Sequence, residues 1–154
     1  MNNMTDEEID NYLFKLEQKL LIESEKITIE LTRNWAKSFP TESAVYLFRE
    51  DDVVRYVGET GSLRGRMKDI LNTKNHTLRR NIGNFYYSDF PSFEKASSQK
   101  NFPIDIEKLL IDKIENKFTV SYILVNLGRK ELEERLFSKL KPRYCIKGKR
   151  TDQN

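Results

Sequence analysis

Two short β-rich runs follow each other between residues 44 and 57, and this stretch constrains the fold of the chain most. Residues 44–48 (AVYLF) and 53–57 (VVRYV) are rich in β-branched and aromatic side chains, and the charged residues 49–52 separate them. This pattern is typical of a β-hairpin. A turn over 58–62 follows, and Ser62 is expected to cap a helix that runs to about residue 71.

Helical periodicity appears on both sides of the hairpin. Thr5 and Glu8 form a capping-box pattern ahead of apolar residues at helical spacing, which predicts a helix over 6–24. A shorter helix is expected over 28–37, before Pro40. Downstream, the pattern predicts a loop over 84–102, a helix over 103–116, a buried strand over 118–126 and a final helix over 129–140.

These elements predict an α/β (α+β) fold with a small three-stranded antiparallel sheet flanked by helices. The length of 154 residues is that of one domain. We expect residues 1–43 to form an N-terminal helical extension packed on a core domain over 44–146, and residues 147–154 to form a basic, flexible tail. The extension is expected either to cover the sheet or to provide a homodimer seam or a surface for a protein partner.

Composition excludes several classes of protein. The chain has nine Phe, seven Tyr and one Trp, which is enough apolar surface for a packed core. Its single cysteine, Cys145, and single histidine, His76, exclude an internal disulfide and a Cys/His metal cluster. No apolar run approaches the ~20 residues of a membrane-spanning helix, and the N-terminus is acidic where a signal peptide is basic. We therefore expect a cytoplasmic protein with no membrane partner.

Charge is distributed unevenly along the chain. Residues 1–43 hold five basic and nine acidic side chains, a net charge of −4, whereas the whole chain carries +3. The remainder therefore carries +7, which favours a polyanionic partner such as nucleic acid. The basic side chains form one block over 64–80 and another over 139–150.

Glu133 is the most anomalous residue of the final helix. At about 100° per residue it lies on the apolar stripe formed by Leu132, Leu136, Phe137 and Leu140. A carboxylate on a packing face costs several kcal/mol unless a cation or hydrogen-bond donors meet it. Glu133 is therefore either a metal ligand or general base, or a residue at a frayed helix end that extends into solvent or pairs with an arginine.

Tyr46 and Tyr56 lie on the two hairpin strands. A hairpin loop with an odd number of residues sets them opposite each other on one face, and a two-residue loop sets them on opposite faces. Arg66 follows on the edge of the next helix, where it either reaches over the sheet or simply extends into solvent.

These residues together resemble the GIY-YIG nuclease superfamily. Ala44-Val45-Tyr46 is followed ten positions after the tyrosine by Tyr56-Val57-Gly58, and Arg66 comes eight positions after the glycine. Glu133-x-x-Leu136-Phe137 and Lys141-Pro142-Arg143-Tyr144 are similar to the end of the nuclease domain of the excision-repair incision subunit. The resemblance covers about 44–146, with 84–117 as a family-variable insertion.

The resemblance implies a GIY-YIG-like fold and a metal-dependent endonuclease. It implies that Tyr46 and Tyr56 surround the attacking water, one of them as general base or relay, and that Arg66 stabilises charge on the scissile phosphate. It implies that Glu133 holds one divalent metal, Mg²⁺ or Mn²⁺. The implied partner is duplex or branched DNA, in repair or restriction. The residues that we expect to contact DNA are Arg64, Lys68, His76, Arg79, Arg80, Lys141, Arg143 and Lys147.

The chain also departs from the family pattern. Ala44 replaces the opening glycine, Glu59 stands where repair members often have lysine, Ile70 replaces a His or Tyr, and Cys145 replaces an asparagine. His76 either takes over the role of proton relay, contacts DNA, or does neither. The alternative function is accordingly a DNA-binding module of the same fold without catalytic turnover, or one subunit of a larger assembly.

Overall fold

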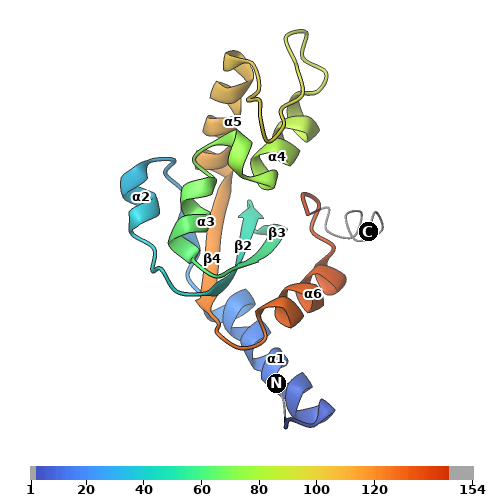
Figure 1. Cartoon of the computed structure of the whole chain (residues 1–154). Helices are drawn as coiled ribbons and strands as arrows, with labels where there is room; N and C mark the ends of the chain where they lie inside the picture. The colour runs from blue at the N-terminus through green and yellow to red at the C-terminus, as the bar shows by residue number, and fades with distance from the viewer. Residues whose placement is uncertain (1–2, 146–154) are drawn as a thin grey trace.

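The computed structural model describes residues 3–145, which form three layers with a sheet between two groups of helices (Figure 1). The helices are α1 (Asp6–Gln18), α2 (Arg33–Lys37), α3 (Leu63–Asp69), α4 (Thr77–Tyr87), α5 (Ile104–Lys117) and α6 (Arg129–Leu140). The strands are β1 (Ile27–Thr28), β2 (Ala44–Glu50), β3 (Val53–Thr60) and β4 (Phe118–Leu124). The expected mixed α/β class with an antiparallel sheet is confirmed. No helix in residues 3–145 is long and apolar enough to cross a membrane, and the tail expected over 147–154 lies outside the described residues.

The sheet has four strands where the sequence predicted three. Its order is β1-β4-β2-β3, and every neighbouring pair is antiparallel. The extra strand, β1, comes from the N-terminal extension, where Ile27 pairs with Val120 and Thr28 with Thr119. Two residues are too few for the alternating pattern by which a strand is recognised in sequence, so β1 was predicted as part of a helix.

Successive side chains of β2 point into two separate cores. Val45 and Leu47 pack with the apolar residues of α1 and α6. Tyr46 and Phe48 point to the other face, which is covered by α2, α3, α4 and α5. This alternation is the period of two that a strand buried on both faces requires, and all seven residues of β2 are buried. Helix α1 therefore packs on this face of the sheet.

The N-terminal helices differ from their predicted lengths. Helix α1 has the predicted capping box, because Thr5 Oγ1 accepts from the Glu8 amide and the Glu8 carboxylate accepts from the Thr5 amide. It ends in a π-helical turn, η1, over Lys19–Glu23. Helix α2 is shorter than the predicted 28–37, because its N-cap is Thr32, whose hydroxyl accepts from the Trp35 amide.

Helix α4 was not predicted, and the loop expected over 84–102 begins only after it. The helix carries Leu78 and Ile82 in the core, and Gly83 lies against the ring of Phe102, where a side chain would overlap that ring. Its polar residues Arg79, Arg80 and Asn81 interrupt the apolar pattern, so the helical period is weak in the sequence. The predicted insertion over 84–117 consists of the end of α4, a loop and α5.

Candidate active site

The β2–β3 hairpin places Tyr46 and Tyr56 on the same face of the sheet, by a route that the sequence did not indicate. The hairpin closes with the two-residue loop Asp51–Asp52, both at positive φ, and this loop alone would put the two tyrosines on opposite faces. A β-bulge shifts the pairing by one residue, because Phe48 pairs with Tyr56 while Arg49 pairs with Val54. This shift brings the two tyrosines back to the same face. Tyr46 therefore lies opposite Gly58, and the two tyrosines share a face although they are not directly paired, an arrangement that matches neither of the two registers left open by the sequence.

The bulge is held from outside the hairpin. Arg55 is the residue without a partner in the ladder, and its carbonyl accepts a hydrogen bond of 2.9 Å from the Tyr144 amide. The two tyrosine rings consequently stack, with centroids 6.3 Å apart and an interplanar angle of 24°. Both are almost fully buried, at 1% exposure for Tyr46 and 7% for Tyr56.

Arg66 reaches the phenol of Tyr46 from α3. Its Nε donates to Tyr46 Oη at 3.2 Å, and its Nη1 donates to Asp69 Oδ2 at 3.1 Å and to the Asn75 carbonyl at 3.4 Å. Helix α3 is placed for this by Ser62, which accepts from the Gly65 amide as predicted for its N-cap. Arg66 is therefore fixed over the sheet, with 26% of its side chain exposed.

Glu133 approaches the same phenol from α6. It is half-buried beside Leu132 and Leu136, which are fully buried on the packing face of that helix. Burial raises the pKa of Tyr46 above its ordinary value; Tyr56 adds to the rise, Arg66 opposes it and the carboxylate of Glu133 adds to it. The charge of Glu133 thus acts on Tyr46, although 87 positions separate the two residues in the sequence.

His76 is a core residue at the edge of this site. It is fully buried, with its ring centroid 5.5 Å from that of Tyr56, and its Nδ1 accepts from the Leu78 amide at 3.1 Å to cap α4. Its Nε2 is buried without a hydrogen-bond partner. Burial and the charges of Arg66, Arg80 and Arg79 hold the pKa of His76 well below 6.5. His76 is therefore neutral at pH 7, with its proton on Nε2, and it has no exposed surface for DNA.

Arg79 is also buried, in contrast to the expected DNA contact. Its Nη2 donates to Glu107 Oε1 at 2.8 Å and its Nη1 to the Ile70 carbonyl at 3.0 Å. Glu107 accepts in addition from Thr73 Oγ1 at 2.7 Å, so the pair ties α4 to α5. The sequence contains no signal for this role, because Arg79 and Glu107 are 28 positions apart.

The other basic residues expected at DNA are distributed as follows. Arg80 is half-buried over the same side of the site, where its Nη1 donates to the Lys74 carbonyl at 2.8 Å and its charge acts on both Arg66 and Tyr56. Lys147 lies outside the described residues. The remaining four, Arg64, Lys68, Lys141 and Arg143, are exposed.

Two departures from the family pattern have structural partners here. Glu59 forms an ion pair with Arg129, with 3.3 Å between Oε2 and Nη1, and this pair joins β3 to the start of α6. Cys145 is half-buried, with its Sγ 3.7 Å from the Val57 carbonyl. Ile70, at the position of the family's His or Tyr, is fully buried in the core.

The buried carboxylate of Glu50 was not singled out from the sequence. It is 6% exposed and accepts from Tyr144 Oη at 3.3 Å, from Arg55 Nε at 3.3 Å and from the hydroxyl of Tyr86. It therefore connects β2 and the bulge residue to α4 and to the segment after α6. An acidic residue that ends a β-rich run was the only available signal, and in the sequence it looked like part of the hairpin loop.

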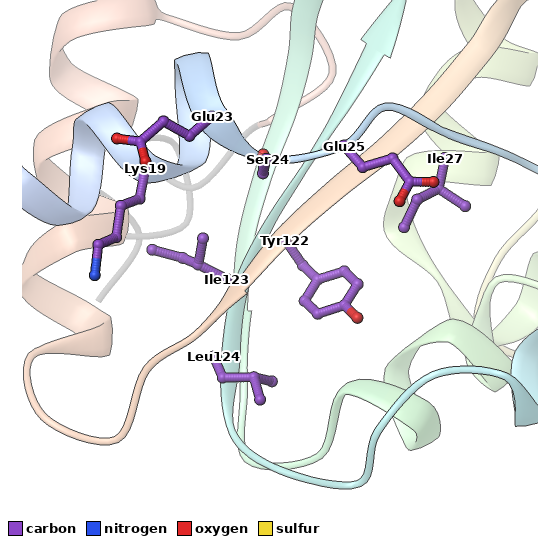
Figure 2. A pocket seen from close by; sticks show the side chains of 8 residues that line it. All are labelled: Lys19, Glu23, Ser24, Glu25, Ile27, Tyr122, Ile123 and Leu124. Carbon is purple, nitrogen blue, oxygen red and sulfur yellow. The ribbon is translucent and has the colours of Figure 1, made fainter.

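A pocket of about 470 Å³ lies at the opposite edge of the sheet from β3 (Figure 2). Its lining side chains come from both ends of η1, from the segment around β1 and from β4. None of the four candidate catalytic residues lines it. The candidate site is instead centred on the phenol of Tyr46, which is hydrogen-bonded to Arg66 and acted on by the charge of Glu133, and whose ring stacks on that of Tyr56.

Similarity to known proteins is found at the level of the fold. No protein-family model matches the chain, and no curated protein matches it significantly. Among solved structures, the chain is similar to the GIY-YIG N-terminal endonuclease domain of UvrC from Thermotoga maritima. A tyrosine point mutant of that domain, bound to its catalytic divalent cation, is 20% identical with a TM-score of 0.45, over 74% of this chain and 93% of that chain. The magnesium-bound form is 19% identical with a TM-score of 0.41, over 86% and 97%.

Proposed function

We propose that this chain is a metal-dependent endonuclease that hydrolyses DNA phosphodiester bonds at Tyr46, Tyr56, Arg66 and Glu133. The observation that supports this most directly is the hydrogen bond of 3.2 Å from Arg66 Nε to Tyr46 Oη, made where the charge of Glu133 acts on the same phenol. Core packing does not require an arginine, two phenols and a carboxylate to meet at one place, whereas phosphodiester hydrolysis requires such groups.

The roles of the two tyrosines differ in this proposal. Because burial raises the pKa of Tyr46, its phenol stays protonated and holds the attacking water by hydrogen bonding. The positive charges of Arg66 and Arg80 both act on Tyr56, and nearby cations favour the anionic form of a phenol. We therefore assign proton removal from the water to Tyr56. Arg66 stabilises the charge that develops on the phosphate, for which a planar guanidinium is suited.

The donor set at the site fits a hard divalent cation that also binds substrate. Residues 3–145 contain no group of three or more His, Cys, Asp or Glu side chains that would form a complete protein cage. Mg²⁺ is commonly held by one or two carboxylates together with water and substrate phosphate, and we assign Glu133 as the carboxylate that would hold it here. Mg²⁺ or Mn²⁺ would supply neutralisation of phosphate charge beside Glu133.

The DNA-facing set is smaller than the sequence suggested. We retain Arg64, Lys68, Lys141 and Arg143, which are exposed, and Arg80, which lies half-buried beside Tyr56. His76 and Arg79 are not retained, because both side chains are buried.

Plasmid cleavage with a matched pair of variants tests the proposal. Supercoiled DNA incubated with Mg²⁺ or Mn²⁺ should be nicked or linearised by the wild type and by Glu134→Ala, whose side chain is exposed one position along α6. Glu133→Ala should abolish cleavage yet bind duplex DNA in metal-free buffer about as well as the wild type. Cleavage that survives in Glu133→Ala would reject the assignment.

The second candidate is a DNA-binding module of this fold without turnover. The burial of Tyr56, to which we assign proton removal, favours it, because a side chain that is only 7% exposed has little contact with water. Ile70, at the position of the family's His or Tyr, favours it as well. In that case labelled duplex should shift without metal, and no divalent cation should produce cleavage by the wild type.

A further inference from the structure

A basic hollow of about 540 Å³ lies between α2 and α3, away from the four catalytic residues. Four cations and a single small residue line it, and we call it the α2–α3 hollow: Arg33, Ala36, Lys37, Arg64 and Lys68. All four cations are exposed, whereas Ala36 is 2% exposed and lies on the packed side of α2. No carboxylate lines the hollow, within the residues that the structure describes.

The hollow is assembled from two matching pairs of side chains. Arg33 and Lys37 are four positions apart on α2, and Arg64 and Lys68 are four positions apart on α3, so each pair lies on one face of its helix. Two helices therefore present basic faces to the same space. Figure 1 shows α2 and α3 side by side at one end of the sheet.

The relative position of the two helices is held by hydrogen bonds from α3 to backbone carbonyls of the segment that follows α2. Arg64 Nε donates to the Phe39 carbonyl at 2.8 Å, and the Arg64 amide donates to the Pro40 carbonyl at 2.9 Å. The Leu63 amide donates to the Glu42 carbonyl at 3.0 Å. The segment that leaves α2 is thus bonded to the first turn of α3, and the four cations are held close together without a bound ligand.

Their positive charge is not neutralised by the protein. Within residues 3–145, none of the four side chains forms an ion pair with a carboxylate, whereas Arg55, Arg66, Arg79 and Arg129 each form one. Four like charges around one hollow repel each other, and an anion bound among them would relieve that repulsion. Two of the four cations, Arg33 and Lys37, come from the N-terminal extension, although that extension is acidic overall.

We propose that the α2–α3 hollow binds backbone phosphate of the DNA whose scissile phosphate meets Arg66, an inference that rests on the proposed function. Arg66 lies on the other side of α3 from Arg64 and Lys68, because a step of two residues turns an α-helix by about 200°. A helix with its side chains is about 10 Å across, close to the ~12 Å width of the major groove. One duplex can therefore contact both sides of α3. A phosphate on one side of a groove would bind Arg66, and a phosphate on the other side would bind Arg64 and Lys68.

The lining of the hollow favours DNA backbone over a free nucleotide. No aromatic side chain lines it, among the described residues, so it has no surface on which a base would stack. Its cations are exposed and shared between two helices, which suits a phosphate that arrives as part of a long polyanion.

Salt-dependent binding of a short duplex in metal-free buffer, where no cutting occurs, tests the hollow separately from catalysis. Arg33→Gln/Lys37→Gln removes the α2 pair. The matched control, Lys15→Gln/Lys19→Gln, removes two exposed lysines with the same spacing from the N-terminal extension. The slope of log affinity against log salt should become shallower by about 0.9 for each phosphate that the α2 variant no longer neutralises. The control should keep the wild-type slope.

Equal slopes for the wild type, the α2 variant and the control would overturn the proposal. An α2 variant that binds duplex normally but no longer binds inorganic pyrophosphate would also overturn it, in favour of a free phosphate ligand. Thermal melting checks that the α2 variant is folded; if it is not, Lys68→Gln alone should show the shallower slope. A wild type that never cuts, together with a shallower slope in the α2 variant, would reject the endonuclease and leave the hollow as a DNA site.

Discussion

The phenol of Tyr46 lies over the bare backbone of Gly58, its partner on β3. A Cβ at Gly58 would overlap Tyr46 Oη and Cζ, so only glycine lets this ring extend across the edge strand. Across that edge Tyr46 comes within range of the charge of Glu133 on α6. The Tyr-Val-Gly triplet thus combines Tyr56, the proposed base, with the space that the ring of Tyr46 needs.

Gly58→Ala should therefore displace the Tyr46 phenol and its hydrogen bond with Arg66. We expect overpacking to lower the free energy of unfolding by about 1–3 kcal/mol, and a displacement of about 1 Å to reduce cleavage by about 10²-fold. The control is Gly61→Ala, whose added Cβ meets only Arg129 Nη1, at 3.7 Å. Denaturation and plasmid cleavage that are alike in the two variants would contradict this account.

Arg66→Lys should separate charge from geometry. Lysine keeps the positive charge but lacks the planar group that reaches Tyr46 Oη and Asp69 together. We expect the rate of cutting at saturating DNA to fall by about 10²–10³, with duplex affinity in metal-free buffer nearly unchanged. Arg135→Lys, a half-buried residue of α6 that pairs with Asp10 and Glu17, should cut at the wild-type rate. Normal cutting by Arg66→Lys would show that charge alone is required.

His76 should make the protein less stable in mild acid. Its folded-state pKa lies well below 6.5, so the unfolded chain binds a proton that the folded chain does not. The free energy of unfolding should therefore fall as pH is lowered below about 6.5, by up to about 1.4 kcal/mol per pH unit. His76→Asn keeps an acceptor for the Leu78 amide and should remove this part of the slope. Urea denaturation between pH 7 and pH 5 measures it, and identical slopes would exclude His76 as the cause.

Glu50→Ala should be among the more destabilising single changes on β2. The substitution leaves Arg55 and the hydroxyls of Tyr86 and Tyr144 without their shared hydrogen-bond acceptor. We expect this loss to lower the free energy of unfolding by roughly 3 kcal/mol. Tyr86→Phe removes one hydrogen bond and should cost only about 1 kcal/mol. Glu94→Ala, which breaks an exposed ion pair with Lys100, should change the free energy of unfolding by about 0.5 kcal/mol or less. Urea melts in which Glu50→Ala resembles Glu94→Ala would show that this cluster does not stabilise the fold.

The local pattern of the sequence was sufficient for several elements. The final helix begins and ends as predicted, at Arg129 and Leu140, because its apolar spacing and the following Pro142 act within one turn of the chain. The N-caps Thr5 and Ser62 were likewise readable, since a capping side chain bonds an amide three positions away. The four candidate catalytic residues were identified by their types and spacing, without knowledge of where their side chains would point.

Tertiary contacts decided what these residues face. The bulge at Arg55 sets both tyrosines on one face, and the Tyr144 amide that bonds its carbonyl comes from 89 positions later in the chain. The burial of Arg79 depends on Glu107 of another helix, and the α2–α3 hollow depends on how two helices 30 residues apart pack. The sequence determined most of the segments that form helices and strands, α4 and β1 excepted, because hydrophobic period and caps act over a few residues. Only the folded chain decided which face of the sheet each tyrosine occupies, which polar residues are buried and what shape the basic surface has. Each of these depends on a contact with a residue far away in the sequence, and local patterns do not indicate such contacts.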